Sequence, residues 1–358
     1  MQLTRFELRD LRNLATVELQ PGPGLNLLLG ANGAGKTSVL EGLHLLAYGR
    51  SFRGRVRDGL VRTGREAVEV FAEWMVAGEE GSHRAGLRHS GGSWDARLDG
   101  EAVGHLGELC AAFMVVTFEP GSHALVSGSG EPRRRFVDWG LFHVEQGFLP
   151  LWRRYSRALR QRNALLKSGA AAGQISAWDH ELASSGEELT RRRTLYLDRL
   201  QDRLGAVADA LAPSLGRMTL EFEPGWRRSS LSLADALAVA RERDRTLGHT
   251  SVGPHRADWK LRLAGKGSGE ALSRGQAKLA ALSCLFAQAA DCAAERSDWP
   301  VIALDDLASE LDAAHRERVL AFLASIPAQA FITGTDPVHP AGPASVFHVE
   351  RGIVSAVG

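Results

Sequence analysis

Four residues near the N-terminus have the types and the spacing needed to bind phosphate groups. Gly30, Gly35, Lys36 and Thr37 match G-x-x-x-x-G-K-[S/T], the phosphate-binding loop motif. Glycine lets the backbone turn so that successive N–H groups face one anion, and the start of the following helix favours negative charge. Lys36 would reach the β- and γ-phosphates, and the Thr37 hydroxyl would hold Mg²⁺. The expected nucleotide ligands are Gly30, Ala31, Asn32, Gly33, Ala34, Gly35, Lys36 and Thr37.

Two neighbouring carboxylates, Asp305 and Asp306, follow an apolar run at residues 301–304. We expect this run to be a buried strand, which would place Asp305 beside the phosphate-binding loop. There Asp305 and Thr37 would hold Mg²⁺, and Asp306 would orient or deprotonate the attacking water. The alternative is that both acids only cap the next helix, which the presence of Lys36 disfavours. Lys36, Asp305 and Asp306 are therefore predicted to act in ATP hydrolysis.

A third element, Ser273-Arg274-Gly275-Gln276, opens a predicted helix at residues 274–293. Alone, it is an N-cap followed by a glycine. Its position before a strand that ends in carboxylates is the order of ABC-type ATPases, whose signature motif contacts the γ-phosphate of a nucleotide held by a second subunit. The resemblance to ABC-type ATPases implies that Ser273, Gly275 and Gln276 complete the partner's site in an ATP-dependent homodimer, with Ser273 contributing to catalysis. Residues 309–312 then occupy the place of the D-loop.

The elements that must position these residues alternate between strands and helices. Strands are expected at residues 2–9, 15–20 and 25–29, an antiparallel meander at 66–99, and a further strand at 111–118. Residues 131–212 read as helical, with a break at 169–173, and strands return near 218–222, 259–263, 301–304 and 330–333. We predict an α/β fold, an ABC-type ATPase head with a largely parallel sheet and an antiparallel β subdomain. The head would span residues 1–125 and 245–358, and an inserted helical arm would span 126–244.

Composition supports an ordinary globular protein of 358 residues, with 44% hydrophobic residues and a formal net charge of +1. Any nucleic-acid site must therefore be a local patch. Cys110, Cys284 and Cys292 show no metal-binding spacing, and we expect Cys284 and Cys292, in an apolar helical stretch, to be buried free thiols. No signal peptide is visible, and the longest apolar stretch, at 279–290, is shorter than a bilayer span. A cytoplasmic protein without a membrane partner is expected.

The most basic segment of the chain, residues 151–167, contains six basic residues and no acid. Arg153, Arg157 and Arg160 fall on one helical face, with Trp152 and Tyr155 interleaved. Such a patch suits phosphate contacts with DNA. The alternative, an arginine face that is solvated or paired with acids elsewhere in the fold, is equally compatible with the sequence alone.

Several segments, which include these motifs, resemble the RecF family of bacterial recombination mediators: residues 12–53, 133–142, 155–167, 251–261, 271–288 and 303–312. RecF proteins are similar to the heads of SMC proteins without the long coiled coils, which agrees with the short arm. The resemblance implies an ATP-dependent DNA-binding protein of gap repair and stalled-fork recovery, with slow, DNA-stimulated ATP hydrolysis. It implies a homodimer that closes on duplex DNA and works with RecR and RecO to place RecA at single-strand/double-strand junctions. It also favours DNA as the ligand of Arg153, Arg157 and Arg160.

Three departures concern the hydrolysis step. Asp306 stands where transporter-type ABC ATPases have glutamate. The switch histidine is absent after the strand at 330–333, where we expect Thr333 or Thr335 to contact the γ-phosphate through its hydroxyl. No Q-loop glutamine follows Phe118. The alternatives are the ATPase subunit of an ABC transporter or another P-loop NTPase, such as a small-molecule kinase. The missing histidine and the large insertion argue against a transporter subunit, and the Ser273 element is unexplained in a kinase.

Overall fold

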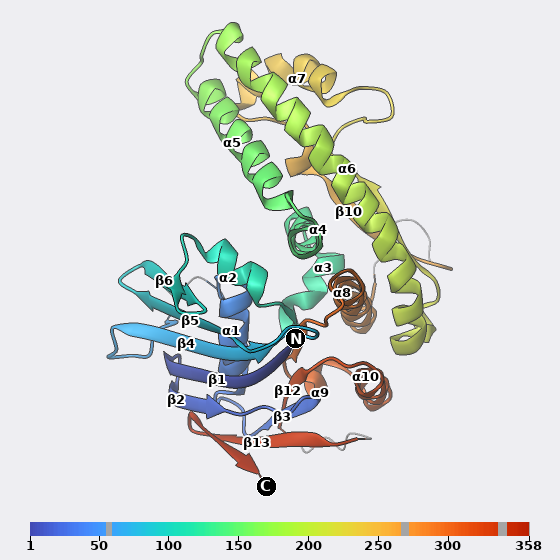
Figure 1. The fold of residues 1–358 in the computed structure, drawn as a ribbon. Coiled ribbons are helices and arrows are strands. Elements are labelled where there is room, and N and C mark those ends of the chain that lie inside the picture. Colours follow the sequence, from blue (N-terminus) through green and yellow to red (C-terminus); the bar gives the residue numbers. More distant parts are fainter. Residues whose placement is uncertain (55–58, 266–271, 336–341, 358) are drawn as a thin grey trace. The chain divides into compact units, whose positions relative to one another are not determined.

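The chain forms two compact units in the computed structural model, which describes residues 1–54, 59–265, 272–335 and 342–357. The first unit, here called the head, contains Met1–Ser122, Val207–Pro213 and Ser273–Gly358. The second, here called the arm, contains His123–Ala206 and Ser214–Leu272. Figure 1 traces both units along the chain.

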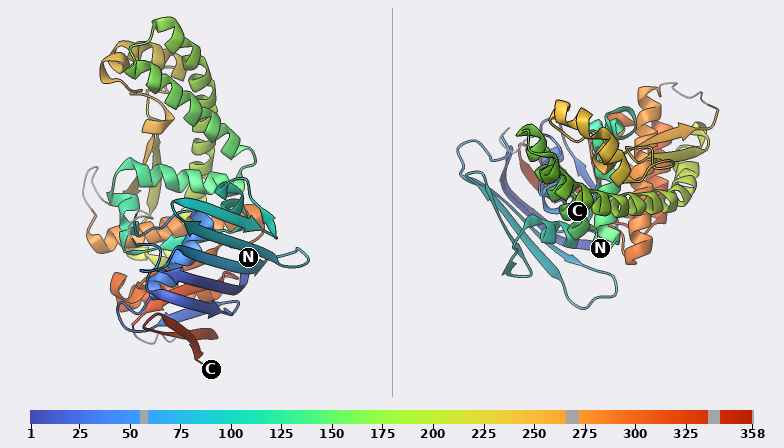
Figure 2. Two further views of the ribbon diagram at one scale, coloured as in Figure 1. Left: turned by 90° about the vertical axis from the view of Figure 1, so that its left-hand side faces the viewer. Right: turned by 90° about the horizontal axis from the view of Figure 1, so that it is seen from above.

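One sheet of the head is antiparallel, with the strand order β2-β1-β4-β5-β6-β7. Its strands are β1 (Gln2–Leu11), β2 (Leu14–Leu19), β4 (Ala67–Met75), β5 (His83–Ser90), β6 (Ser93–Leu98) and β7 (Glu101–Ala102). Alternation along β1 buries Leu3 and Leu8 and leaves Arg9 exposed. The meander predicted at 66–99 is confirmed, and Figure 2 shows it as part of a broad twisted layer.

The other sheet of the head has the order β14-β13-β3-β12-β11-β8 and is parallel except for β14. Its strands are β3 (Leu25–Leu29), β8 (Val115–Phe118), β11 (Val301–Leu304), β12 (Ala330–Gly334), β13 (Ala344–Glu350) and β14 (Ile353–Val357). Every residue of β8, β11 and β12 is buried, as expected of a sheet covered on both faces. The carboxyl ends of β3, β12 and β11 therefore meet at one edge of the sheet.

Among the described residues of the head, five α-helices accompany these sheets: α1 (Lys36–Tyr48), α2 (Leu106–Ala112), α8 (Arg274–Arg296), α9 (Leu307–Glu310) and α10 (Ala313–Ser325). The strand predicted at 111–118 is wrong in its first half, because residues up to Ala112 complete α2 and the strand begins at Val115. Gly42 allows α1 to approach β1, since a β-carbon there would lie 2.4 Å from Leu8 Cδ2.

Helix α8 is a core helix of the head. It is longer than the apolar stretch 279–290, and by length and composition it is the one helix among the described residues that would suffice to cross a membrane. Most of it is buried, with Leu282 and Phe286 inaccessible to solvent, and it packs against β8. Cys284 and Cys292 are buried free thiols, as predicted, and burial raises the pKa of each to about 12.

The arm is built mainly from helices: α3 (Ala124–Ser127), α4 (Gly130–Val144), α5 (Phe148–Lys167), α6 (Ala172–Leu211) and α7 (Leu233–Leu247). The predicted break lies between α5 and α6, where Gly169 adopts φ 67°. A two-stranded sheet of β9 (Met218–Glu223) and β10 (Asp258–Leu263) completes the unit. Because β10 pairs with β9, residues 245–272 group with the arm, whereas the sequence assigned them to the head.

A buried ion network ties the arm helices together. Arg162 of α5 is inaccessible to solvent; it donates to Asp179 of α6 at 2.7 Å and to Asp244 of α7 at 2.7 Å. The same guanidinium donates to Thr250 Oγ1 at 2.9 Å. Asp244 is also fully buried, and its second oxygen accepts the Ser251 N–H. These bonds compensate the loss of solvation that an isolated buried charge would suffer.

Candidate nucleotide site

The phosphate-binding loop joins β3 to α1 and has the backbone conformation that its glycines permit. Gly33 and Gly35 adopt φ 77° and 119°, in the left-handed half of conformational space. Gly30 meets a different constraint, because a β-carbon there would lie 2.0 Å from the Val349 carbonyl oxygen of β13. Lys36 Nζ donates to the carbonyl oxygens of Gly30 at 2.7 Å and Ala31 at 2.9 Å. The lysine thus lies folded over the concave side of its own loop.

Asp305 lies beside this loop, as the sequence predicted, at the carboxyl end of β11. Its Oδ1 atom accepts hydrogen bonds from Thr37 Oγ1 at 2.9 Å and Thr333 Oγ1 at 2.8 Å. The side chain is buried, and this burial raises the pKa of Asp305 above its ordinary value. A hydroxyl and a carboxylate held this close are hard oxygen donors of the kind that Mg²⁺ prefers. Thr37 and Asp305 therefore fit the metal role predicted for them.

Asp306 follows in a left-handed conformation, with φ 51° and ψ 46°. Its N–H donates to Thr333 Oγ1 at 2.7 Å. Asp306 and Thr333 line a cavity of about 360 Å³ together with Lys36 and Thr37. The remaining lining residues are Arg12, Asn13, Asn32, Gly33, Gly35, Ser38 and Arg53. The cavity therefore combines a cationic, amide-rich wall, suited to phosphates, with an acidic edge suited to a cation and a water molecule.

The basic side of the cavity includes residues that sequence reasoning missed or left unassigned. Arg12 forms a bidentate pair with Glu41, which is inaccessible to solvent, at 2.8 and 3.0 Å. Arg53 lines the same cavity, and its Nη1 atom lies 3.7 Å from Glu41 Oε2. The available signal was Glu41 itself, an acid within the largely apolar middle of α1.

The Ser273 element is at the start of α8. Within the described residues, it is not among those that line this cavity. Ser273 Oγ accepts the Gln276 N–H, and the Gln276 side chain accepts the Ser273 N–H, which together form a capping box. Ser273 and Gly275 are both exposed. The N-cap reading of the motif is therefore correct within one chain, and its surface remains accessible to a second molecule.

Comparison with known proteins identifies the family. The profile of the RecF/RecN/SMC N terminal domain matches residues 2–342. The DNA replication and repair protein RecF of Stenotrophomonas maltophilia (strain R551-3) is 63% identical over 356 residues, which cover 98% of this chain and 97% of that protein. This chain belongs to the RecF family. The RecF protein of Shewanella denitrificans (strain OS217 / ATCC BAA-1090 / DSM 15013) is 36% identical over the full length of both chains.

Solved structures agree with this placement in the RecF family. The structure of the recombination mediator protein RecF-ATP in the RecFOR pathway matches this chain with a TM-score of 0.88 and 26% sequence identity. The match covers 100% of this chain and 98% of that one. The corresponding RecF-ATPrS structure has a TM-score of 0.86. An SmcHead structure at 16% identity and a TM-score of 0.63 shares the fold. The predicted ABC-type head with an inserted helical arm is therefore confirmed as the fold class.

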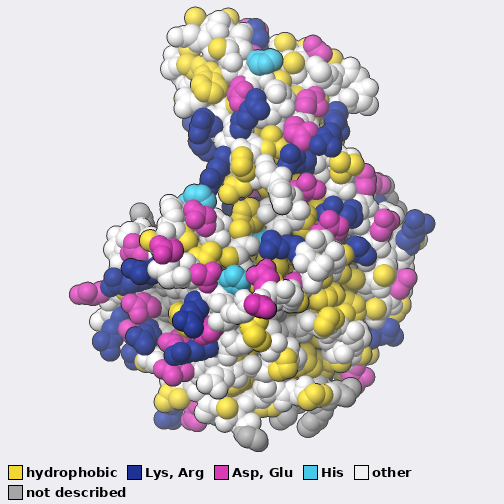
Figure 3. Space-filling model, in the orientation of Figure 1, with side chains coloured by type: hydrophobic (Ala, Val, Ile, Leu, Met, Phe, Trp, Pro, Cys, Tyr) yellow, Lys and Arg dark blue, Asp and Glu magenta, His cyan; other side chains and the backbone are white. Residues whose placement is uncertain are grey.

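The arm arginines of this RecF-family chain separate into two groups. Arg153, Arg157 and Arg160 are exposed on α5, and within the described part of the chain no ion pair involves them. Arg154 instead pairs with Glu181, and Arg162 belongs to the buried network. The sequence patch is therefore smaller than its six basic residues suggested. Figure 3 shows basic side chains interspersed with acidic ones on the side of the arm that faces the viewer.

The neighbouring aromatic and arginine residues are largely structural. Tyr155 is buried, which leaves Trp152 as the exposed aromatic residue of the patch. In the preceding helix, Arg133 is buried and bonds Asp258 through two nitrogens at 2.6 and 2.8 Å, while Arg134 donates to the Ala257 carbonyl oxygen. These arginines stabilise the arm and are poor candidates for DNA contacts.

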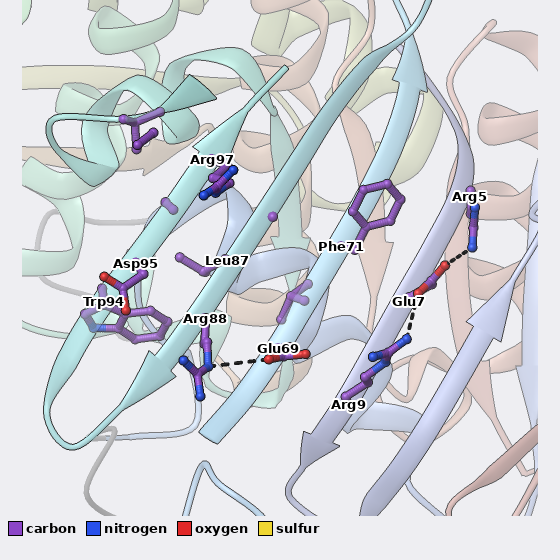
Figure 4. Close-up of a pocket in the computed structure, with 15 residues that line it drawn as sticks. Arg5, Glu7, Arg9, Glu69, Phe71, Leu87, Arg88, Trp94, Asp95 and Arg97 are labelled. Atoms are coloured by element: carbon purple, nitrogen blue, oxygen red, sulfur yellow. Dashed lines mark ion pairs between the residues drawn. The ribbon is translucent and has the colours of Figure 1, made fainter. Parts of the chain in front are cut away.

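A larger hollow of about 790 Å³ lies on the antiparallel sheet of the head. Figure 4 shows that Glu7 lies between Arg5 and Arg9 and that Arg88 faces Glu69. The pairs of Glu7 lie along β1, and the Arg88–Glu69 pair joins β5 to β4. These ion pairs satisfy the charges within the sheet itself, as on a solvated β-sheet face. The smaller cavity, in which the phosphate-binding loop and the carboxylates converge, is therefore the better nucleotide site.

Proposed function

We propose that this chain is an ATP-dependent DNA-binding protein of recombinational repair that acts with RecO and RecR to help load RecA. The single observation that carries the ATP-dependent part is that Lys36, Thr37 and Asp306 line one cavity, with Asp305 hydrogen-bonded to Thr37 beside it. The RecF-ATP neighbour and its placement in the RecFOR pathway support the same reading. In this proposal, the DNA substrate is a gap or a stalled fork that arises during replication and repair.

The loop glycines and Lys36 bind the triphosphate through backbone N–H groups and a single positive charge. Lys36 exchanges its two carbonyl acceptors for phosphate oxygens when the nucleotide enters. Thr37 and Asp305 would hold Mg²⁺, which would supply positive charge against the negative charge that develops on the phosphates. Arg12 and Arg53 add positive charge to the cavity wall, and Glu41 fixes the side chain of Arg12.

Hydrolysis depends on Asp306, which lines the cavity next to Lys36 and Thr37. Its carboxylate orients the attacking water and accepts a proton from it. The shorter side chain of aspartate, compared with glutamate, holds that water less closely, which favours slow turnover. Slow turnover suits a protein whose ATP-bound state must persist on DNA until partners arrive.

Two copies share each nucleotide in this proposal. One copy supplies the phosphate-binding loop, and the other supplies Ser273, Gly275 and Gln276 at the N-terminus of α8, whose amides and dipole favour an anion. ATP therefore drives dimerisation, and the dimer closes on duplex DNA. Arg153, Arg157 and Arg160 contribute sequence-independent phosphate contacts. ATP hydrolysis then releases the DNA.

Mixing two inactive variants tests this arrangement. Lys36→Ala removes the loop cation, and Ser273→Arg blocks the signature element, so each homodimer lacks both sites. A mixed dimer regains one intact site, formed by the loop of the Ser273→Arg copy and the signature element of the Lys36→Ala copy. Random pairing in a symmetric dimer then restores up to about a quarter of wild-type ATPase activity. An equimolar mixture that stays as inactive as either variant contradicts sharing of the site.

A further inference from the structure

The cavity contains a hydroxyl that bonds both acidic residues, the carboxylate of Asp305 and the backbone N–H of Asp306, and that none of the roles above uses. Thr333 lies near the end of β12, which is paired with β3 on one side and with β11 on the other. It is buried, with 1% of its surface exposed, yet it contributes to the cavity wall. β12 therefore places this side chain between the phosphate-binding loop and the two acids.

The Thr333 hydroxyl uses both of its hydrogen-bonding capacities at the site. As a donor it bonds Asp305 Oδ1 at 2.8 Å, and as an acceptor it receives the Asp306 N–H at 2.7 Å. Thr37 shares the first contact but not the second. Thr333 thus connects the side chain of one acid to the backbone of the next. A hydroxyl is the group that can do this, because it donates and accepts at one atom.

The hydrogen bond from the Asp306 N–H to Thr333 acts at a residue whose backbone conformation is energetically unfavourable. Asp306 has φ 51°, a left-handed conformation that a residue with a side chain adopts only when its surroundings fix it. The Asp306 N–H lies within this turn, and Thr333 is its acceptor. Loss of the acceptor would leave the N–H unsatisfied and would release the turn that aims the Asp306 carboxylate. The first bond similarly selects one orientation of the Asp305 carboxylate.

We propose that Thr333 is a positioning residue that sets the metal-binding orientation of Asp305 and the water-orienting conformation of Asp306 together. The inference rests on the proposed ATPase function, and it deepens the account of that site. It assigns to Thr333 a role different from direct contact with the γ-phosphate, which the sequence suggested. Residues that orient metal ligands typically change metal affinity or activity by about 10- to 100-fold when removed.

Three substitutions separate the hydroxyl from the bulk of the side chain. Thr333→Val keeps the shape and removes the hydroxyl, whereas Thr333→Ser and Thr333→Ala differ from each other only by that hydroxyl. The measurement is steady-state ATP hydrolysis as a function of Mg²⁺ concentration at saturating ATP, together with binding of a fluorescent ATP analogue in EDTA. Thermal unfolding of each variant accompanies both assays.

Thr333→Val and Thr333→Ala are expected to raise the Mg²⁺ concentration at half-maximal activity by about 10-fold or more and to lower kcat. Thr333→Ser is expected to restore most of both values, and all variants should bind the analogue in EDTA with similar affinity. Equal Mg²⁺ dependence in the Ser and Ala variants overturns the inference and leaves the proposed function intact, even if Thr333→Val fails to fold. A wild-type protein that neither binds nor hydrolyses ATP overturns both.

Discussion

Replacing Arg153, Arg157 and Arg160 together by glutamine tests whether the arm contacts DNA phosphates. These positions follow an i, i+4, i+7 pattern on α5, so the three side chains emerge from one face of the helix. All three are exposed. Glutamine keeps helical propensity and removes only the charge, and circular dichroism should therefore show unchanged helix content.

The size of the effect follows from counterion release. Each protein cation that neutralises a phosphate of duplex DNA adds about 0.9 to the slope of log affinity against log salt concentration. Loss of three such contacts should lower the magnitude of this slope by up to about 2.7. Over a fourfold increase in salt, wild-type affinity should then fall roughly 40-fold more than the affinity of the triple variant.

The assay is fluorescence anisotropy of labelled duplex DNA, titrated at several salt concentrations with ATP and Mg²⁺ present. Arg154→Gln is the matched control, because Arg154 lies on the same helix but pairs with Glu181. For Arg154→Gln, the slope of log affinity against log salt concentration should change by less than about 0.9, the contribution of one phosphate contact. An unchanged slope in the triple variant, or an equal change in Arg154→Gln, would refute the assignment of DNA contacts to these three arginines.

Three further predictions concern the arm network and the two acids. Asp244→Ala removes one partner of the buried Arg162 pair and should lower the free energy of unfolding by about 3–5 kcal/mol in urea titrations. The control is Glu242→Ala, because Glu242 is exposed on the same helix; this variant should change the free energy of unfolding by less than about 0.5 kcal/mol. Asp306→Asn should trap an ATP-bound dimer, and light scattering that finds only monomer with ATP would argue against it. Burial raises the pKa of Asp305, so the stability linked to that group is present at low pH and lost as pH rises through the folded-state value. In the ligand-free protein, Asp305→Asn should therefore make Tm decline less steeply with rising pH than it does in the wild type. The same substitution should abolish Mg²⁺-dependent hydrolysis. A decline of Tm in the variant as steep as in the wild type would contradict the pKa argument.

The nucleotide site could be predicted from sequence because its signals are local. The strand at 25–29 and the glycines after it specify the phosphate-binding loop within a few residues of one another, and the structure has the strand at the predicted bounds. Asp305 was found in the same way, from an apolar run that ends in a carboxylate. Its approach to Thr37 then follows from the meeting of parallel strand ends at one edge of the sheet.

The arm was less predictable because its decisive contacts are distant in sequence. Arg162 looked like part of a basic patch, yet its partner Asp244 lies 82 residues further along the chain. Likewise Arg133 bonds Asp258 across 125 residues. When a helix carries arginine on both a buried and an exposed face, no local pattern distinguishes the two faces. The end of the arm, predicted at residue 244, was also misplaced because the pairing of β10 with β9 joins segments that are distant in sequence.

Duplex-DNA affinity with and without ATP and Mg²⁺, compared between the wild type and Ser273→Arg, tests the central claim most directly. The account predicts that ATP and Mg²⁺ tighten DNA binding by the wild type, and that Ser273→Arg loses this gain while still binding ATP. Wild-type affinity that is the same with and without ATP, or a Ser273→Arg variant that keeps the full gain, would contradict an ATP-driven dimer that closes on DNA.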